Sequence, residues 1–154
     1  MRKLLSSGLA VFAGMVSLPA PGSMHGEQKA PIADHRLARL QAFFAKSDCP
    51  AKAYSTDFLA AADRYALDWR LLPSISYVES TGGKSARNNN LFGWDSGRAS
   101  FRTVRACIHE VGYKLTHSQL YRSKSLDQLL AIYNPSGAYA QKIKSVMAQI
   151  APAQ

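Results

Sequence analysis

The stretch that decides the fold covers residues 68–94 and reads DWRLLPSISYVESTGGKSARNNNLFGW. Its first half predicts a short helix that follows an Asp68 cap and tolerates Pro73 near its start. Its second half is rich in Gly, Ser and Asn and predicts a loop that begins near Gly82. A helix that ends directly in such a loop can present its last side chains at an opening in the surface.

Glu79 stands at the C-terminal end of this predicted helix. Leu72 and Ile75 form an apolar stripe at helical spacing, and Glu79 follows Ile75 by four positions, so we expect all three on one face. A charged carboxylate is costly to bury unless it is paired or functional, and burial favours the protonated form that a general acid needs. Glu79 is therefore our candidate proton donor. A capping or salt-bridged glutamate is the alternative.

The loop offers amide groups beside aromatic rings. Asn89 and Asn90 carry donors and acceptors, and Phe92 and Trp94 follow them closely. Sugars present hydroxyl groups at their edges and C–H groups on their faces, so a sugar site needs both kinds of contact. We therefore predict that these four side chains line a sugar-binding groove next to Glu79.

Further motifs follow in order and complete a pattern within residues 55–150. The motifs are Tyr77-Val78-Glu79-Ser80, Asn89-Asn90-Leu91-Phe92-Gly93-Trp94, Phe101-Arg102-Thr103, Ala106-Cys107-Ile108, Tyr121-Arg122-Ser123-Lys124-Ser125-Leu126, Tyr133-Asn134-Pro135 and Tyr139-Ala140-Gln141-Lys142-Ile143. Together they resemble the endo-β-N-acetylglucosaminidase family of bacterial cell-wall hydrolases, which belongs to the lysozyme-like superfamily. The resemblance implies a lysozyme-like fold and cleavage of the glycan strand of peptidoglycan. It also implies catalytic roles for Glu79 and Tyr133 and substrate contacts at Ser80 and Asn134.

The identity of the second catalytic group stays open. Asp95 directly follows the loop and is the candidate second carboxylate, although Asp95-Ser96-Gly97 also fits a turn. Many members of the family carry a further acid between the Glu and the Asn motif, whereas residues 80–88 hold none here. Three functions therefore stay open: an N-acetylglucosaminidase, a lytic transglycosylase in which the substrate's own hydroxyl attacks, and a wall-binding module that has lost turnover.

Helical periodicity predicts a mainly α fold. We expect a single lysozyme-like domain of about six helices over residues 35–151, including helices at 35–46, 55–66 and 137–150. Ser125 and Gln128 form a capping box that opens another helix. A small β-hairpin near the cleft, at residues 94–101, is the only strand feature considered, with its turn at residues 95–97.

The N-terminal residues predict export. Arg2 and Lys3 precede an apolar run that ends at Leu18, which is typical of a signal peptide over residues 1–20. Residues 21–34 resemble a linker. We expect a periplasmic, extracellular or wall-associated protein without stable membrane insertion after cleavage, and an uncleaved anchor is the alternative.

The two cysteines of an exported chain suggest a disulfide between Cys49 and Cys107. Such a bridge would tie the N-terminal helix to the rest of the domain. Two unpaired thiols, with Cys107 filling core space, are the alternative.

The charge of the chain favours an acidic partner. The formal net charge is +9, and 47% of the residues are hydrophobic, as in a globular protein. The scattered histidines lack metal-ligand spacing, and no phosphate-binding or nucleic-acid-binding motif occurs. We expect peptidoglycan glycan strands as the partner, no nucleic acid, no metal and no cofactor. A basic but merely soluble surface is the alternative.

Overall fold

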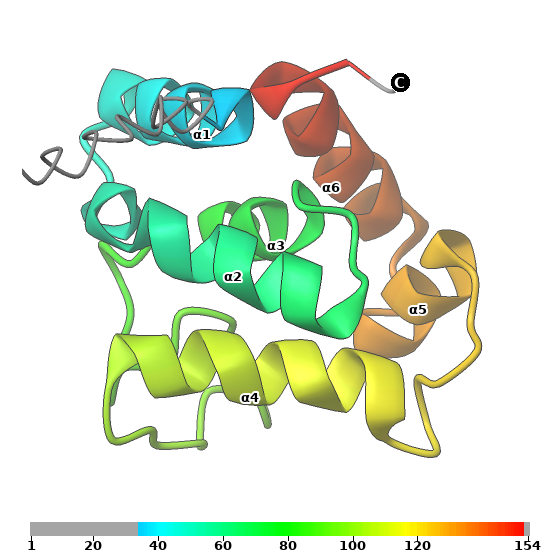
Figure 1. The fold of residues 1–154 in the computed structure, drawn as a ribbon. Helices are drawn as coiled ribbons and strands as arrows, with labels where there is room; N and C mark the ends of the chain where they lie inside the picture. The colour runs from blue at the N-terminus through cyan, green and yellow to red at the C-terminus, as the bar shows by residue number, and fades with distance from the viewer. Residues whose placement is uncertain (1–33, 153–154) are drawn as a thin grey trace, which may run out of the picture. The chain divides into compact units, whose positions relative to one another are not determined.

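The computed structural model describes residues 34–152, and these residues form a unit of six α-helices (Figure 1). The helices are α1 (His35–Lys46), α2 (Ser55–Tyr65), α3 (Leu71–Ser80), α4 (Val104–His117), α5 (Leu126–Tyr133) and α6 (Gly137–Ile150), and a short 3-10 helix, η1 (Pro50–Tyr54), precedes α2. The expected mainly α fold is therefore confirmed. The predicted signal peptide and linker residues 21–33 lie outside the described residues. Within the described range, no helix has the length and apolar character needed to cross a bilayer.

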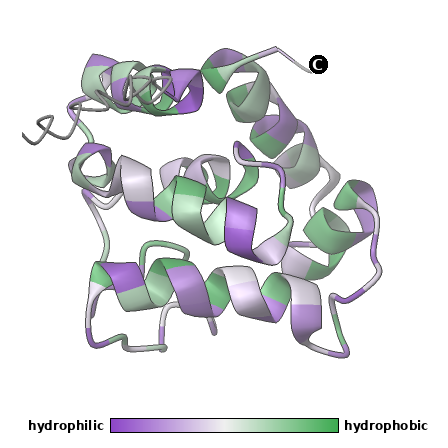
Figure 2. Ribbon diagram, viewed as in Figure 1, coloured by the Kyte–Doolittle hydropathy of each residue, from purple (hydrophilic) through white to green (hydrophobic). Residues whose placement is uncertain are grey.

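The apolar stripe of α3 lies in the core of the unit. Leu72 and Ile75 are almost fully buried, together with Phe58 of α2, Ile108 of α4 and Ile143 of α6. Helix α2 packs along α4, and α3 packs along α6. Figure 2 shows hydrophobic and hydrophilic residues alternating along α2 and α4. Because full burial of each such side chain contributes about 1.5–3 kcal/mol, these contacts hold α3 firmly and fix where its C-terminal end lies.

The C-terminal end of α3 follows the sequence pattern, whereas the expected Asp68 cap is wrong. The helix begins at Leu71 with Arg70 at the N-cap position and no capping side chain, and the Asp68 carboxylate accepts from the Arg70 amide at 2.9 Å in the turn before the helix. At the other end, Thr81 adopts a left-handed conformation. A Cβ added at Gly82 would lie 2.8 Å from the Cβ of Cys49, so this close approach requires glycine. The helix therefore stops at the predicted break.

The expected hairpin at residues 94–101 is wrong. Residues 34–152 contain no strand, and their only ladder-type pairing is an isolated bridge at the start of the loop. Asp95 and Ser96 both have positive φ angles, of 54° and 53°. The Asn90 side chain hydrogen-bonds to both the amide and the carbonyl of Trp94. A neighbouring strand would need these same backbone groups for pairing. The segment is therefore a compact loop.

The expected disulfide is also wrong, because Cys49 and Cys107 are separate buried thiols. Cys49 packs against Gly82, and its thiol donates to the Ser47 carbonyl at 3.7 Å. Cys107 lies beneath the backbone of Leu91, and burial raises the pKa of its thiol to about 12. Both cysteines therefore act as small core residues.

Candidate active site

Glu79 is half-buried at the last turn of α3, and the following loop passes directly over its carboxylate. A Cβ added at Gly93 would lie 3.0 Å from Oε2 of Glu79. Gly93 also has a φ of +59°, a left-handed conformation that favours glycine. A larger residue at position 93 would therefore have to displace either the loop or the acid.

Two buried polar side chains hold the loop in this position. The Ser80 hydroxyl donates to the carbonyl of Leu91 at 2.8 Å, which ties the loop to α3. The Asn90 Oδ1 accepts from the Trp94 amide at 2.9 Å, and its Nδ2 donates to the Trp94 carbonyl at 3.0 Å. Both side chains are thus engaged by backbone groups, and they position the loop relative to Glu79.

Two hollows of different chemistry meet at Gly93. The smaller one, of about 140 Å³, is lined by Glu79, Ser80, Ser85, Arg87, Asn90, Gly93 and Gly97. The larger one, of about 350 Å³, is lined by Gly93, Trp94, Asp95, Ser96, Leu120, Tyr121 and Tyr133. The first offers a carboxylate, a guanidinium and hydroxyl groups, and the second offers aromatic rings. An extended ligand that crossed Gly93 would meet both.

The aromatic hollow is built around Trp94. The ring centroid of Trp94 lies 6.0 Å from that of Tyr121 and 5.8 Å from that of Tyr133. The Lys114 ammonium lies 5.3 Å from the indole centroid. These contacts hold the indole in one orientation, which lowers the entropy cost of stacking a flat ligand on it.

Two tyrosines lie close to Glu79, and sequence reasoning singled out only one of them. The Tyr133 hydroxyl donates to the Phe92 carbonyl, and the Tyr139 ring stacks parallel to that of Tyr133 at 5.9 Å. Burial first, and the nearby Glu79 carboxylate second, raise the pKa values of both hydroxyls above the ordinary value of 10.0. The Tyr139 hydroxyl is buried and makes no hydrogen bond of good geometry within residues 34–152, but hydrogen bonding toward the Glu79 carboxylate contributes to its raised pKa. It is therefore placed to interact with that acid.

Three expected contact residues lie elsewhere. The Asn89 side chain donates to the Phe101 carbonyl at 2.8 Å and lines a separate hollow. The Phe92 ring is fully buried in the core, so only its carbonyl takes part in the site. Asn134 accepts from the Ser136 amide at 3.0 Å in the connection between α5 and α6. None of these side chains lines the two hollows at Gly93.

Asp95 lies in the aromatic hollow but is engaged by a neighbour. Its carboxylate forms an ion pair with Arg98 at 2.8 Å, and both side chains are exposed. Asp95 is one of three consecutive residues with positive φ angles, as expected for a turn. Glu79 is therefore the one acid that lines the polar hollow in the described part of the chain.

Residues 34–152 contain no cluster of three acidic, histidine or cysteine side chains arranged to hold a metal ion. No family model, curated protein or solved structure matches the chain.

Proposed function

We propose that this protein is an exported peptidoglycan hydrolase that cleaves β-1,4 glycosidic bonds of the glycan strand, in the manner of an N-acetylglucosaminidase. The observation that carries the proposal is the position of Glu79, at the junction of a polar and an aromatic hollow. Sugar strands need hydrogen-bonding groups and aromatic faces along their path. A single acid at the junction could protonate the glycosidic oxygen that links two bound sugars.

Each group around the junction has a role in this proposal. Glu79 donates a proton to the leaving glycosidic oxygen, and Trp94 stacks on a sugar ring. Tyr133 is fixed by its bond to the Phe92 carbonyl and presents its oxygen to water or to the N-acetyl group of the substrate. Tyr139 is a positioning residue, because its buried hydroxyl lies beside the Glu79 carboxylate.

A lytic transglycosylase is the second candidate, and one observation favours it. The polar hollow holds a single acid, and the Asp95 carboxylate is bound by Arg98. An enzyme in which the substrate's own hydroxyl attacks can use one carboxyl group, which protonates the leaving oxygen and then accepts the proton of the attacking hydroxyl, so this arrangement would suffice.

Analysis of the products from purified sacculi by mass spectrometry separates the candidates. A reducing N-acetylglucosamine end identifies a glucosaminidase, and a 1,6-anhydro end identifies a transglycosylase. A reducing N-acetylmuramic acid end identifies a muramidase and would correct the bond that we assign. Sedimentation with sacculi without any release would identify a binding module and overturn the enzymatic proposal.

The Glu79→Gln variant tests the catalytic role directly. Glutamine keeps the shape and most hydrogen bonds but cannot donate the proton. We expect wall lysis to fall by about 10²–10⁴-fold, because general acid catalysis typically contributes this much, with an unchanged or slightly higher melting temperature. Glu110→Gln, on the exposed side of α4, is the matched control and should lyse at the parent rate. A folded Glu79→Gln protein with parental activity would remove Glu79 from the mechanism.

A further inference from the structure

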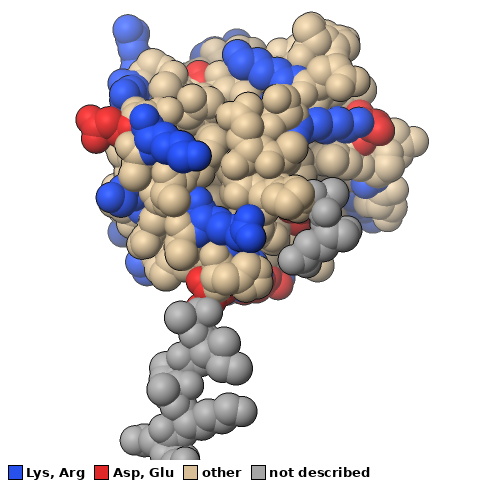
Figure 3. Space-filling model, turned by 90° about the horizontal axis from the view of Figure 1, so that it is seen from above, with Lys and Arg blue, Asp and Glu red and all other residues tan. Residues whose placement is uncertain are grey.

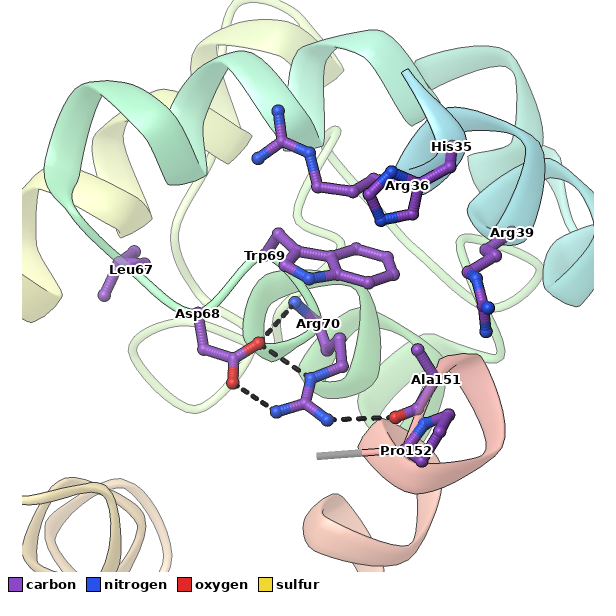
Figure 4. Close-up of a pocket in the computed structure, with 9 residues that line it drawn as sticks. All are labelled: His35, Arg36, Arg39, Leu67, Asp68, Trp69, Arg70, Ala151 and Pro152. Carbon is purple, nitrogen blue, oxygen red and sulfur yellow. Dashed lines mark hydrogen bonds and ion pairs between the residues drawn. The ribbon is translucent and has the colours of Figure 1, made fainter. Parts of the chain in front are cut away.

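Another hollow lies where the start of α1, the α2–α3 connection and the end of α6 meet (Figure 4). Its volume is about 350 Å³, which falls within the range of small-ligand sites. It shares no lining residue with either hollow at Gly93. A role for this hollow is therefore separate from the proposed bond cleavage.

The walls of this hollow are held by paired charges. Arg36 binds the carboxylates of Asp34 and Asp63, each at 2.7 Å. Arg70 binds the Asp68 carboxylate at 2.6 Å and donates to the Ala151 carbonyl at 2.9 Å. These bonds join α1 to α2 and the α2–α3 connection to the end of α6. The side chains that form the walls are thus ordered before a ligand arrives, which reduces the cost of binding.

Two groups in the hollow are left to meet a ligand. The half-buried Trp69 indole lies in the middle of the hollow, between His35 and Arg36 on one side and Arg70 on the other (Figure 4). Arg39 lies at its edge, exposed, and forms no ion pair within residues 34–152. Figure 3 shows Lys and Arg side chains spread over the face that is uppermost in Figure 1, where α1 lies. Within the described residues, the hollow thus combines an aromatic face with a guanidinium that no carboxylate pairs.

We propose that this hollow binds a carboxylate that stands next to a small apolar group, with the carboxylate at Arg39 and the apolar group against Trp69. Guanidinium groups bind carboxylates in a bidentate manner, and an indole face accepts C–H groups. Peptidoglycan stem peptides carry free carboxylates, and a terminal D-alanine places a methyl group beside one of them. The choice of the stem peptide as the source of this carboxylate rests on the proposed function. The binding of a carboxylate at Arg39 and an apolar group at Trp69 does not.

N-acetyl-D-alanyl-D-alanine is a suitable probe because it carries one carboxylate, and its C-terminal amide is the matched neutral ligand. Calorimetry would measure affinity, and the indole N–H signals of Trp69 and Trp94 in an NMR spectrum would report the place of binding. We expect the acid to bind and to shift the Trp69 signal alone. The amide should bind at least about tenfold more weakly, since it loses a charge-assisted bond.

Substitutions test the two groups separately. Arg39→Gln should weaken binding of the acid about tenfold. Arg102→Gln should not, because this exposed arginine lines neither this hollow nor the two at Gly93. Trp69→Ala should abolish binding, and Trp69→Phe keeps an aromatic face if the alanine variant fails to fold.

Several outcomes would overturn the inference. Among them are equal binding of acid and amide, parental affinity in Arg39→Gln, a shift of the Trp94 signal instead of Trp69, and no binding at millimolar concentration. Digestion of sacculi by the parent and the Glu79→Gln variant tests the proposed function separately, so either proposal can fail while the other stands.

Discussion

At the scale of single residues, Gly93 links the loop to the acid. Gly93→Ala places an L-residue at a φ of +59° and brings a methyl group to 3.0 Å from Oε2 of Glu79. The backbone strain should cost about 1–2 kcal/mol of unfolding free energy. Because the methyl group also displaces the carboxylate, we expect wall lysis to fall well beyond what the loss of folded protein explains. Thermal unfolding and turbidity assays on the same samples measure both effects.

Gly83 provides the matched control for this substitution. It has a φ of +97° and lines neither hollow at Gly93, and a Cβ added there meets only Pro50, at an ordinary contact distance of 3.5 Å. Gly83→Ala should therefore show a similar loss of stability with near-parental lysis. Equal loss of lysis in both variants would mean that loop strain, and not contact with Glu79, explains the effect.

The tyrosines near Glu79 predict a change at alkaline pH. The chain has seven tyrosines, and the fold raises the pKa values of Tyr133 and Tyr139 above the ordinary value of 10.0, chiefly through burial. A raised pKa in the folded state means that the stability from these groups is complete below pH 10 and falls as the pH rises above it. Ultraviolet titration of phenolate should show them ionising only as the protein unfolds. Tyr139→Phe should remove one late-ionising group, and a native chain whose seven tyrosines all titrate together near pH 10 would contradict this.

At the scale of elements, local pattern was sufficient for the helices. Asp34 caps α1 by accepting from the Arg36 amide at 2.9 Å, and the expected capping box of Ser125 and Gln128 opens α5. Apolar residues at helical spacing indicate which face of a helix is buried, because the face that packs against the core must be apolar along its length. Helix existence was therefore predictable, and the remaining differences are short, such as η1 before α2.

The loop was predictable in composition but not in the direction of its side chains. Asn88 and Asn89 have positive φ angles of 52° and 58°, which turn neighbouring side chains to different faces. As a result Asn90 points inward and binds the loop backbone, while Asn89 binds the Phe101 carbonyl. No periodicity in the sequence reports such left-handed positions.

The tyrosine pair was hidden for a different reason. The apolar face of α6 includes Tyr139, and its spacing is that of any core residue. Only the packing of α6 along α3 brings that ring onto Tyr133 and its hydroxyl close to Glu79. Glu79 and the two tyrosines are far apart in the sequence and meet only through tertiary structure. The site could therefore be predicted only in part.

At the scale of the whole molecule, the proposed activity on the wall requires export. Residues 1–20 have the basic start and apolar run of a signal peptide. The mature protein isolated from its host should therefore have an N-terminus near residues 18–24, as determined by N-terminal sequencing. Full-length chain confined to the cytoplasm would contradict the proposed location. Glu110→Gln can serve as the control for export, because the substituted residue lies far from the N-terminal segment in the sequence.

The net charge of the chain predicts how wall binding should depend on salt. Removal of residues 1–20, with Arg2 and Lys3, would leave 17 basic against 10 acidic residues, and this formal charge of +7 would attract the carboxylates of the wall. The screening length falls from about 30 Å at 0.01 M salt to about 8 Å at 0.15 M, so sedimentation of the inactive Glu79→Gln variant with sacculi should decrease over this range. Hydrolysis of a neutral chitooligosaccharide by the parent should change little, because stacking on Trp94 and hydrogen bonds in the polar hollow involve no charge on that substrate. Sacculus binding that ignores salt would show that the basic surface has no part in recognition. If hydrolysis of the neutral oligosaccharide fell in parallel with sacculus binding, the salt would be acting on the catalytic site itself. The basic surface would then not act independently of the sugar-binding hollows at Gly93.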